Sequence, residues 1–247
     1  MCTVSWRRGR AGDYDLFFNR DELHTRALEQ APTIGNDRGT TFLAPRDGDR
    51  GGTWLLVNAR AITVCLLNDY ANPWQPAVNA ATGRGHVVLA CAGATTLAAV
   101  DSLVRAQPLA QLAPFRLLAL APDEGPLRLH WDGLELAAQR GAAVVAPLSS
   151  SSFAPAEVVP ARHARFPAFV RDPRQAEPIE LWAYHRDHHG DQGARSVLMR
   201  RPDAATRSIC HVSVDATHVR LGYEAVAWKD DGPVISAPQS FELERSG

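Results

Sequence analysis

The order in which strand and helix patterns follow one another limits the folds open to this chain of 247 residues more than any other feature. Short apolar runs typical of strands come in groups, and helical patterns separate the groups. A doubly wound parallel sheet would instead alternate strand and helix. The order therefore predicts an α+β fold with two mainly antiparallel sheets stacked face to face and flanked by helices. The expected strands are 2–7, 14–19, 53–58, 61–67, 116–121, 127–131, 142–146, 195–200, 208–214, 219–227 and one near Phe241, and the expected helices are 85–106 (in two pieces), 157–171 and 177–187.

The first two strands give the clearest local prediction. Residues 2–7 and 14–19 flank the segment 9–13, which carries two glycines and an aspartate, a combination typical of a hairpin turn. The hairpin would bring the end of the second strand beside the N-terminus. The segment after Asn19 is charged and contains proline and glycine, so we expect a loop there.

The composition indicates an ordinary globular protein and excludes several classes. Apolar residues make up 45% of the chain, charged residues 21%, and no composition break divides it, so we expect one domain, 1–247. A net charge of -1 gives no general attraction to nucleic acid or to an anionic membrane. No apolar stretch approaches the ~18 residues of a membrane helix. The first residues do not resemble a signal peptide, so a cytoplasmic location is expected.

Cys2 is the first candidate for chemistry, because of its position. A small residue after Met1 normally permits removal of that methionine, and Cys2 would then carry a thiol and a free α-amine. Their reference pKa values are about 8.5 and about 8, so one residue supplies a nucleophile and a base near neutral pH. The alternative is an ordinary second residue. The other cysteines, Cys65, Cys91 and Cys210, lie in apolar runs and are expected to be buried free thiols.

A polar cluster, Asn19-Arg20-Asp21-Glu22, ends the second strand, where the hairpin would place it beside Cys2. Arg20 could there stabilise a thiolate and lower the pKa of the thiol. Asp21 could hold an ammonium group or orient the amine. The alternative is a charged loop exposed to solvent.

Two further motifs suggest a pocket. Two glycines lead into Trp54 in the segment 51–55, which indicates a close backbone approach, and Trp54 could line a pocket. The strand 61–67 is followed by Asn68, whose amide could donate within an oxyanion hole. The alternatives are a turn beside a core aromatic residue for the first motif and an Asx turn for the second.

Together these motifs resemble the NRDE family, which takes its name from the tetrapeptide and includes the transport-and-Golgi-organisation proteins of animals. The likeness covers residues 1–90 and returns near 206–243. It implies the four-layer αββα fold of N-terminal-nucleophile (Ntn) hydrolases and a kinship with choloylglycine hydrolases and penicillin V acylases. The matching motifs are Met1-Cys2, Asn19-Arg20-Asp21-Glu22, Gly51-Gly52-Thr53-Trp54-Leu55, Leu67-Asn68-Asp69-Tyr70, Gly83-Arg84-Gly85 and Thr206-Arg207-Ser208.

The resemblance implies a catalytic role for each of five residues. Cys2 would be the nucleophile, and Arg20 would support its thiolate. Asp21 would bind the α-amine. Asn68 would donate to the oxyanion, and Arg207 would be a second active-site arginine.

Three more residues, Asn19, Trp54 and Ser150, are the expected substrate-binding residues. One departure accompanies them, because the related amidases position substrate with an asparagine in the region where this chain has the serines 149–152. If Met1 is retained, moreover, the α-amine of Cys2 is locked in a peptide bond and cannot act as a base.

Two functions are therefore open. In the first, the protein cleaves a non-peptide C–N bond through a thioester on Cys2. In the second, the same cleft carries heme, a lipid or acyl-CoA without cutting it, because the NRDE family has no settled reaction and a fold does not fix a function. In both, the partner is a small molecule, and no cofactor is expected.

The histidines at 185, 188 and 189 are a last candidate. On a helix they would share one face, which suits a transition metal. Gly190 instead predicts a helix end, where histidine interacts favourably with the dipole. We expect a solvated helix end and no metal site.

Overall fold

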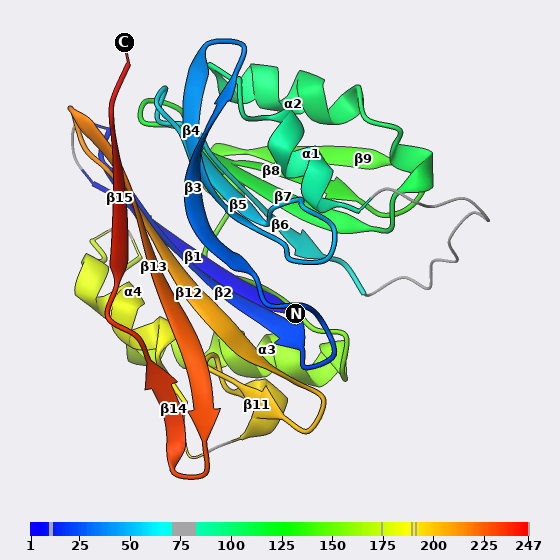
Figure 1. The fold of residues 1–247 in the computed structure, drawn as a ribbon, viewed down its shortest axis with the longest axis vertical. Helices are drawn as coiled ribbons and strands as arrows, with labels where there is room; N and C mark the ends of the chain where they lie inside the picture. The colour runs from blue at the N-terminus through cyan, green and yellow to red at the C-terminus, as the bar shows by residue number, and fades with distance from the viewer. Residues whose placement is uncertain (10–11, 71–82, 174, 189, 191, 247) are drawn as a thin grey trace.

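Two antiparallel β-sheets form the centre of the structure (Figure 1). The computed structural model describes residues 1–9, 12–70, 83–173, 175–188, 190 and 192–246. In the first sheet the order is β10-β1-β2-β12-β13-β14, with β11 beside β12 and β15 beside β13. Its strands are β1 (Cys2–Arg8), β2 (Tyr14–Leu23), β10 (Leu148–Ser150), β11 (Arg200–Arg201), β12 (Ala204–Val214), β13 (His218–Lys229), β14 (Gly232–Ile235) and β15 (Gln239–Glu244).

The second sheet follows the chain, in the order β3-β4-β5-β6-β7-β8-β9. Its strands are β3 (Gln30–Asp37), β4 (Thr40–Arg46), β5 (Leu55–Asn58), β6 (Thr63–Asn68), β7 (Phe115–Leu120), β8 (Leu127–Trp131) and β9 (Leu136–Arg140). The α-helices are α1 (Gly85–Ala90), α2 (Leu97–Arg105), α3 (Pro155–Arg165) and α4 (Pro178–His185), and the 3₁₀ turns are η1 (Leu109–Gln111), η2 (Gly141–Ala143), η3 (Phe166–Ala168) and η4 (Gly193–Arg195).

The helices cover the outer faces of the two sheets (Figure 1): α1 and α2 lie on the second sheet, and α3 and α4 on the first. Leu16 and Phe18 of β2 pack between the sheets against Leu55 and Leu118, whereas Phe17 packs beneath α4. Successive residues of a strand face opposite sides, so β2 is buried on both. The expected αββα layering is confirmed. No helix in the described ranges is long and apolar enough to cross a membrane.

The elements predicted with the strongest local signals are confirmed. β1 and β2 pair antiparallel along the whole of β1. The expected helix over 85–106 is broken into α1 and α2, and Thr96 accepts from the Ala99 amide at the start of α2. The strand expected near Phe241 is β15.

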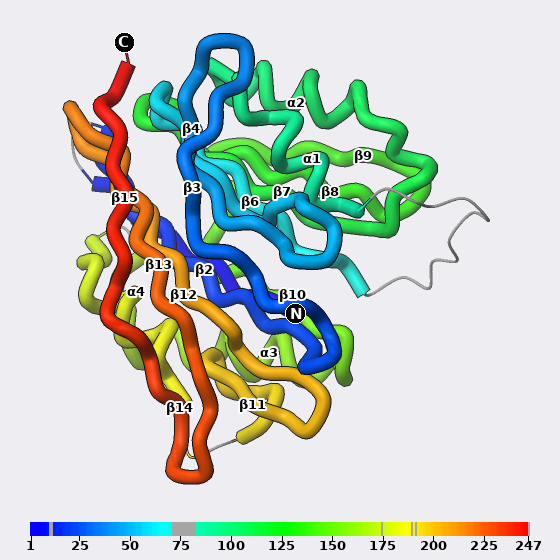
Figure 2. The backbone as a smooth tube through the Cα atoms, in the orientation of Figure 1, coloured from blue at the N-terminus to red at the C-terminus, as the bar shows by residue number. Residues whose placement is uncertain are grey.

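The loop predicted after Asn19 is wrong, because most of it is the hairpin β3–β4. β3 is an edge strand whose outer face meets solvent, and Ile34 is 65% exposed. A strand in that setting needs few apolar residues, so its sequence is similar to that of a loop. Arg38 and Gly39 both have positive φ, as a two-residue hairpin turn requires. The hairpin stands near β15 of the first sheet (Figure 2).

Two predicted strands are also wrong. The apolar run at 142–146 begins inside the η2 turn and leaves Val145 67% exposed, and it joins no sheet. Within the run at 195–200, residues 196–199 are buried but form no strand, and only the short β11, which begins at Arg200, pairs with a neighbour. β9, β10 and β14 were not predicted, since the outward residues of β9 are polar or small and β10 and β14 are only 3 and 4 residues long.

The solvated helix end predicted for the histidines is wrong for His185, which is fully buried. His185 Nδ1 lies 2.8 Å from Asn19 Oδ1, and Nε2 lies 2.8 Å from Ser5 Oγ. Because an amide oxygen accepts only, Nδ1 carries the proton and Nε2 accepts from the Ser5 hydroxyl. His188 hydrogen-bonds through Nδ1 to the Leu198 carbonyl, and His189 lies outside the described residues.

The burial of His185 predicts a loss of stability in acid. It lowers the pKa of His185 to about 3, with smaller contributions from neighbouring Arg186 and His211. The unfolded chain takes up the proton below pH ~6.5 and the folded chain does not, so the free energy of unfolding falls as pH drops from there towards 3. The contribution is about 1.4 kcal/mol per pH unit. Urea denaturation across this range should show a shallower pH dependence for His185→Gln than for wild type.

Exposed His86 supplies the control, since His86→Gln should leave the pH dependence unchanged. Parallel pH curves for wild type and His185→Gln would contradict the buried, neutral imidazole. His185→Gln should also lower stability at neutral pH, because it disturbs the bonds to Ser5 and Asn19.

Candidate active site

Cys2 lies at the start of β1, between β2 and β10. It pairs with Arg20 on one side and Ser150 on the other. Its amide nitrogen also donates to Ser150 Oγ at 3.2 Å. The predicted hairpin therefore does bring Cys2 beside the polar cluster at the end of β2.

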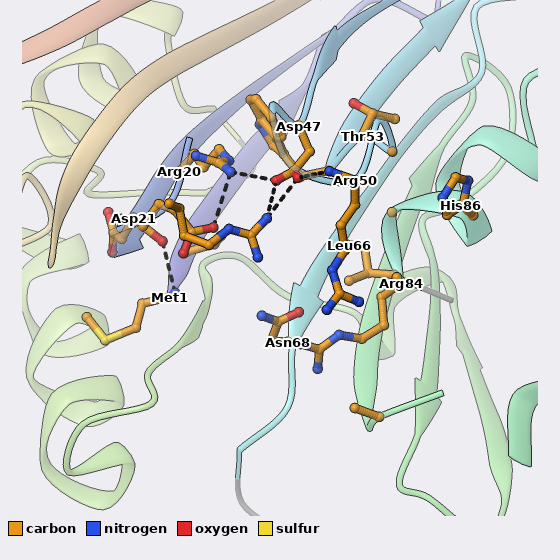
Figure 3. Close-up of a pocket in the computed structure, with 18 of the residues that line it drawn as sticks. Met1, Arg20, Asp21, Asp47, Arg50, Thr53, Leu66, Asn68, Arg84 and His86 are labelled. Carbon is orange, nitrogen blue, oxygen red and sulfur yellow. Dashed lines mark hydrogen bonds and ion pairs between the residues drawn. The ribbon is translucent and has the colours of Figure 1, made fainter. Parts of the chain in front are cut away.

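A cleft of about 420 Å³ opens beside Cys2, and both sheets contribute to its walls (Figure 3). Five of the residues predicted from the sequence line it: Cys2, Arg20, Asp21, Trp54 and Asn68. The end of β2 and the end of β6 thus face the same space, as the position of polar residues at both strand ends suggested.

Cys2 is partly buried, and the loss of solvent around its thiol raises the pKa above the ordinary value. The positive N-terminal ammonium and Arg20 act in the opposite direction, and the Asp21 carboxylate reinforces the rise. Arg20 does act to lower the pKa of this thiol, as predicted, but the net shift is upward. Desolvation disfavours the thiolate more than nearby positive charge favours it.

Arg20 has little charge left to offer the thiol. Its guanidinium forms ion pairs with Glu29 at 3.1 Å, Glu22 at 3.1 Å and Asp47 at 2.9 Å. It also lies over the ring of Trp54, 4.5 Å from the centroid. This arrangement makes Arg20 a fixed part of the cleft wall and explains why Trp54 is held there.

The other three cysteines are inaccessible by comparison. Cys65, Cys91 and Cys210 are fully buried, and burial raises the pKa of each, that of Cys91 to about 12. Cys2 is the partly exposed thiol and the one that lines the cleft. Nucleophilic chemistry by a cysteine in this fold therefore falls to Cys2.

Asp21 is tied down by buried partners. Its side chain is fully buried, accepts from Arg162 Nη1 at 2.9 Å and accepts from the Thr206 hydroxyl at 2.7 Å. Its backbone carbonyl, rather than its carboxylate, accepts from the ammonium of Met1 at 3.0 Å. Asp21 therefore fixes the end of β2 around the N-terminus.

Asn68 ends β6 and turns its side chain into the cleft (Figure 3). Its Nδ2 donates to the Tyr70 hydroxyl at 2.8 Å. A primary amide carries two N–H groups, so one remains for a ligand. This geometry is compatible with the predicted oxyanion donor.

Three predicted site residues lie elsewhere. Asn19 is buried on the opposite face of β2, where Nδ2 donates to the carbonyls of His185 and Val197. Arg207 donates to the Leu23 carbonyl at 3.1 Å and does not line the cleft. Ser150 contacts the nitrogen of Cys2 but does not line the cleft.

The structure adds residues that sequence reasoning did not single out for the site. Arg162 of α3 is fully buried beneath Asp21. Arg50 and Arg84 enter the cleft from the segments before β5 and before α1. Arg84 did carry a signal, because it lies between two glycines.

Two stacked antiparallel sheets, outer helices and a cysteine at the start of the first strand define an Ntn-hydrolase-like protein. The structure is similar to a variant of the conjugated bile acid hydrolase from Clostridium perfringens, with 9% identity, a TM-score of 0.61 and coverage of 99% of this chain and 97% of that one. It is also similar to the penicillin V acylase from Agrobacterium tumefaciens, with 10% identity, a TM-score of 0.58 and coverage of 98% and 86%. A third similar structure is the Caenorhabditis elegans N-acylethanolamine-hydrolyzing acid amidase orthologue, with 8% identity, a TM-score of 0.56 and coverage of 85% and 92%.

The sequence identifies the family. Residues 1–154 match the family described as Transport and Golgi organisation 2, and the chain belongs to that family. None of the curated proteins matches the chain. The solved structures share too little sequence to say more than that the fold is the same.

Proposed function

We propose that this protein is an Ntn cysteine hydrolase that cleaves non-peptide C–N bonds in small-molecule amides. The observation that carries the proposal is the place of Cys2, a partly exposed thiol at the first residue of β1 that opens onto the cleft. Among the structures with the same fold are an acylase and an acid amidase, which supports this reaction class.

The reaction requires the α-amine of Cys2, and so the removal of Met1. The amine takes the thiol proton, and the thiolate adds to the amide carbon. The C–N bond breaks, the leaving amine takes the proton back from the α-ammonium, and a thioester remains on Cys2. Water then gives a proton to the α-amine and attacks the thioester, which releases a carboxylic acid and restores the thiol.

The raised pKa of the Cys2 thiol makes the α-amine more important to this scheme. A thiol that is protonated at neutral pH needs a base beside it when the substrate binds. The free N–H of Asn68 is the proposed donor to the oxygen that becomes negative in the tetrahedral intermediate. Arg20 is held by the carboxylates of Glu22, Glu29 and Asp47. It therefore forms a fixed polar part of the cleft wall rather than a mobile counter-ion for the thiolate.

A binding protein without turnover is the second candidate, and Met1 favours it. Met1 is 7% exposed, and its sulfur accepts from the Ser151 hydroxyl at 3.0 Å. While Met1 is in place, Cys2 has no free amine. In this case the cleft would hold a ligand such as heme, a lipid or acyl-CoA, and Cys2 would line the cleft without forming a covalent bond to the ligand.

The proposal includes a reducing, cytoplasmic setting and a small-molecule partner. All four cysteines are free, as is usual where thiols are kept reduced. A free thiol at Cys2 is also what the proposed reaction needs. Its oxidation or capping would remove the nucleophile.

Intact-mass spectrometry tests the function directly. The protein as purified should lack the mass of Met1, and exposure to a panel of activated amides and thioesters followed by acid quenching should add one acyl group. Peptide mapping should place that group on Cys2. Complete retention of Met1, with no adduct and tight binding of heme or an acyl chain, would favour the second candidate.

A further inference from the structure

The guanidinium groups of two cleft arginines, Arg50 and Arg84, stand apart from the carboxylates that the structure describes, although the Arg50 backbone amide donates to Asp47 at 3.0 Å. Arg50 lies in the turn between β4 and β5, and Arg84 immediately precedes α1. Arg84 Nη1 donates to the Pro114 carbonyl at 3.0 Å. Among the residues that the structure describes, neither guanidinium forms an ion pair. Both groups therefore keep N–H donors and a full positive charge for another partner.

The other arginines of the cleft are already neutralised. Arg20 is surrounded by carboxylates, and Arg26 binds Asp47 at 2.8 Å and Asp49 at 2.5 Å. Both carboxylate oxygens of Asp47 are thus in use. The acidic groups of the cleft gather around Arg20 and Arg26, so the side with Arg50 and Arg84 remains positive.

Glycines place these two arginines on the same side of the cleft. A Cβ atom on Gly85 would come within 2.8 Å of the Thr53 nitrogen, and one on Gly52 within 2.9 Å of Gly85. The Thr53 amide also donates to the Gly85 carbonyl. The two segments therefore touch backbone to backbone, which only glycine permits.

A third glycine completes the arrangement. A Cβ on Gly83 would lie 3.1 Å from Cδ of Arg50, so the Arg50 side chain passes directly over this glycine. Figure 3 shows the side chains of Arg50 and Arg84 both extending towards Asn68. The glycines of the segments 51–55 and 83–85 thus bring the guanidinium groups of Arg50 and Arg84 near the Asn68 side chain, which is the proposed oxyanion donor.

An anion would relieve an electrostatic cost at this place. Burial lowers the pKa of Arg84, and the charge of Arg50 acts in the same direction, against the opposing effects of Tyr70, Cys2 and Glu22. Arg84 is half-buried and Arg50 is exposed, and two like charges that lie close together are stabilised by a shared anion. Guanidinium groups bind carboxylate and phosphate through paired hydrogen bonds, which an ammonium or a neutral amide does not match.

We propose that Arg50 and Arg84 form an anion subsite in the Cys2 cleft, which selects ligands that carry a carboxylate or a phosphate. The inference rests on the proposed function in taking this cleft as the substrate site. It adds a substrate class, namely amides with an anionic group on one side of the scissile bond.

Calorimetric titration with matched probes tests the subsite. N-butanoylglycine carries a carboxylate, N-butanoyl-O-phosphoethanolamine carries a phosphate, and N-butanoylglycinamide is the neutral analogue. The wild type should bind at least one anionic probe about tenfold more tightly than the neutral one. Which anion binds better distinguishes a carboxylate from a phosphate ligand. Cys2→Ala is titrated in parallel in case the wild type consumes a probe.

Variants assign the effect to these side chains. Arg50→Gln and Arg84→Gln should each remove most of the preference for the anion, while Arg84→Lys should retain part of it. Arg60 is exposed, lies outside the cleft and serves as the control, so Arg60→Gln should keep the full preference. Circular dichroism checks that each variant is folded.

Three results would overturn the inference: equal affinity for charged and neutral probes, a preference that survives both glutamine variants, or no binding of any probe at millimolar concentration. Failure of the proposed reaction gives a different pattern. An absent acyl adduct together with an arginine-dependent preference would leave the subsite standing and remove the chemistry.

Discussion

Replacing Cys2 with alanine should abolish amide turnover and acyl-adduct formation, while the affinity for the amide changes by less than about threefold. The expected loss in kcat is at least about 10³-fold, because the thiol forms the bond that defines the reaction and no other cysteine reaches the cleft. Removing one sulfur atom from the cleft wall takes away little of the contact that holds a bound amide. The measurements are steady-state kinetics for kcat and calorimetry for Kd.

Cys91 provides the matched control, since it is a buried thiol beneath the second sheet's helices and does not line the cleft. Cys91→Ala should lower stability somewhat and leave kcat unchanged. A Cys2→Ala protein that still turns amides over would sink the nucleophile assignment. If the wild type shows no turnover and Cys2→Ala binds the ligand more weakly than the wild type does, the protein would instead be a carrier.

The parts of the fold that the sequence predicted are those whose apolar pattern and turn residues agree locally. The β1–β2 hairpin has both, and its register sets Cys2 opposite Arg20. The β3–β4 hairpin has only the turn signal, at Arg38 and Gly39, because an edge strand exposed on one side needs few apolar residues. Apolar content alone also misled, since the buried residues 196–199 are packed without being a regular strand.

Strand alternation explains which of the predicted site residues line the cleft. Arg20 faces the cleft, so its neighbour Asn19 must point to the other side of β2, towards α4. The register of β12 against β2 shifts between Thr206 and Ser208, and Arg207 lies at that irregularity, which no sequence pattern announces. The spacing of motifs along a strand thus predicted the elements better than the direction of each side chain.

Residues that reach the site from distant segments could not be predicted in this way. Arg162 lies 141 residues from Asp21 in sequence, on a helix whose other arginine, Arg165, is partly exposed. Arg50 and Arg84 meet because glycines let two loops touch. Such contacts depend on how the layers stack, and a single sequence carries no pattern for them.

Replacing Arg162 with alanine should lower the free energy of unfolding by about 3–5 kcal/mol, the largest effect we expect on stability. The Arg162 side chain is fully buried and donates to Asp21 at 2.9 Å, to Thr3 at 2.9 Å and to the Ala194 carbonyl at 3.1 Å. Alanine would leave the Asp21 carboxylate buried without its counter-ion and remove a large side chain from a packed position. Urea denaturation measures the loss.

Arg165, one turn further along α3, separates this effect from a general sensitivity of the helix. It pairs with Asp187 at 2.8 Å but is about one-third exposed, so Arg165→Ala should cost less than about 1 kcal/mol. Asp21→Asn combined with Arg162→Ala should cost less than the sum of the two single changes, because the pair then loses both charges together. Equal losses for Arg162→Ala and Arg165→Ala, or strict additivity in the double variant, would show that the buried ion pair does not hold α3 to the end of β2. Because Asp21 follows Arg20, the residue of β2 that pairs with Cys2, Arg162→Ala should reduce acyl-adduct formation on Cys2 even under conditions where the variant remains folded.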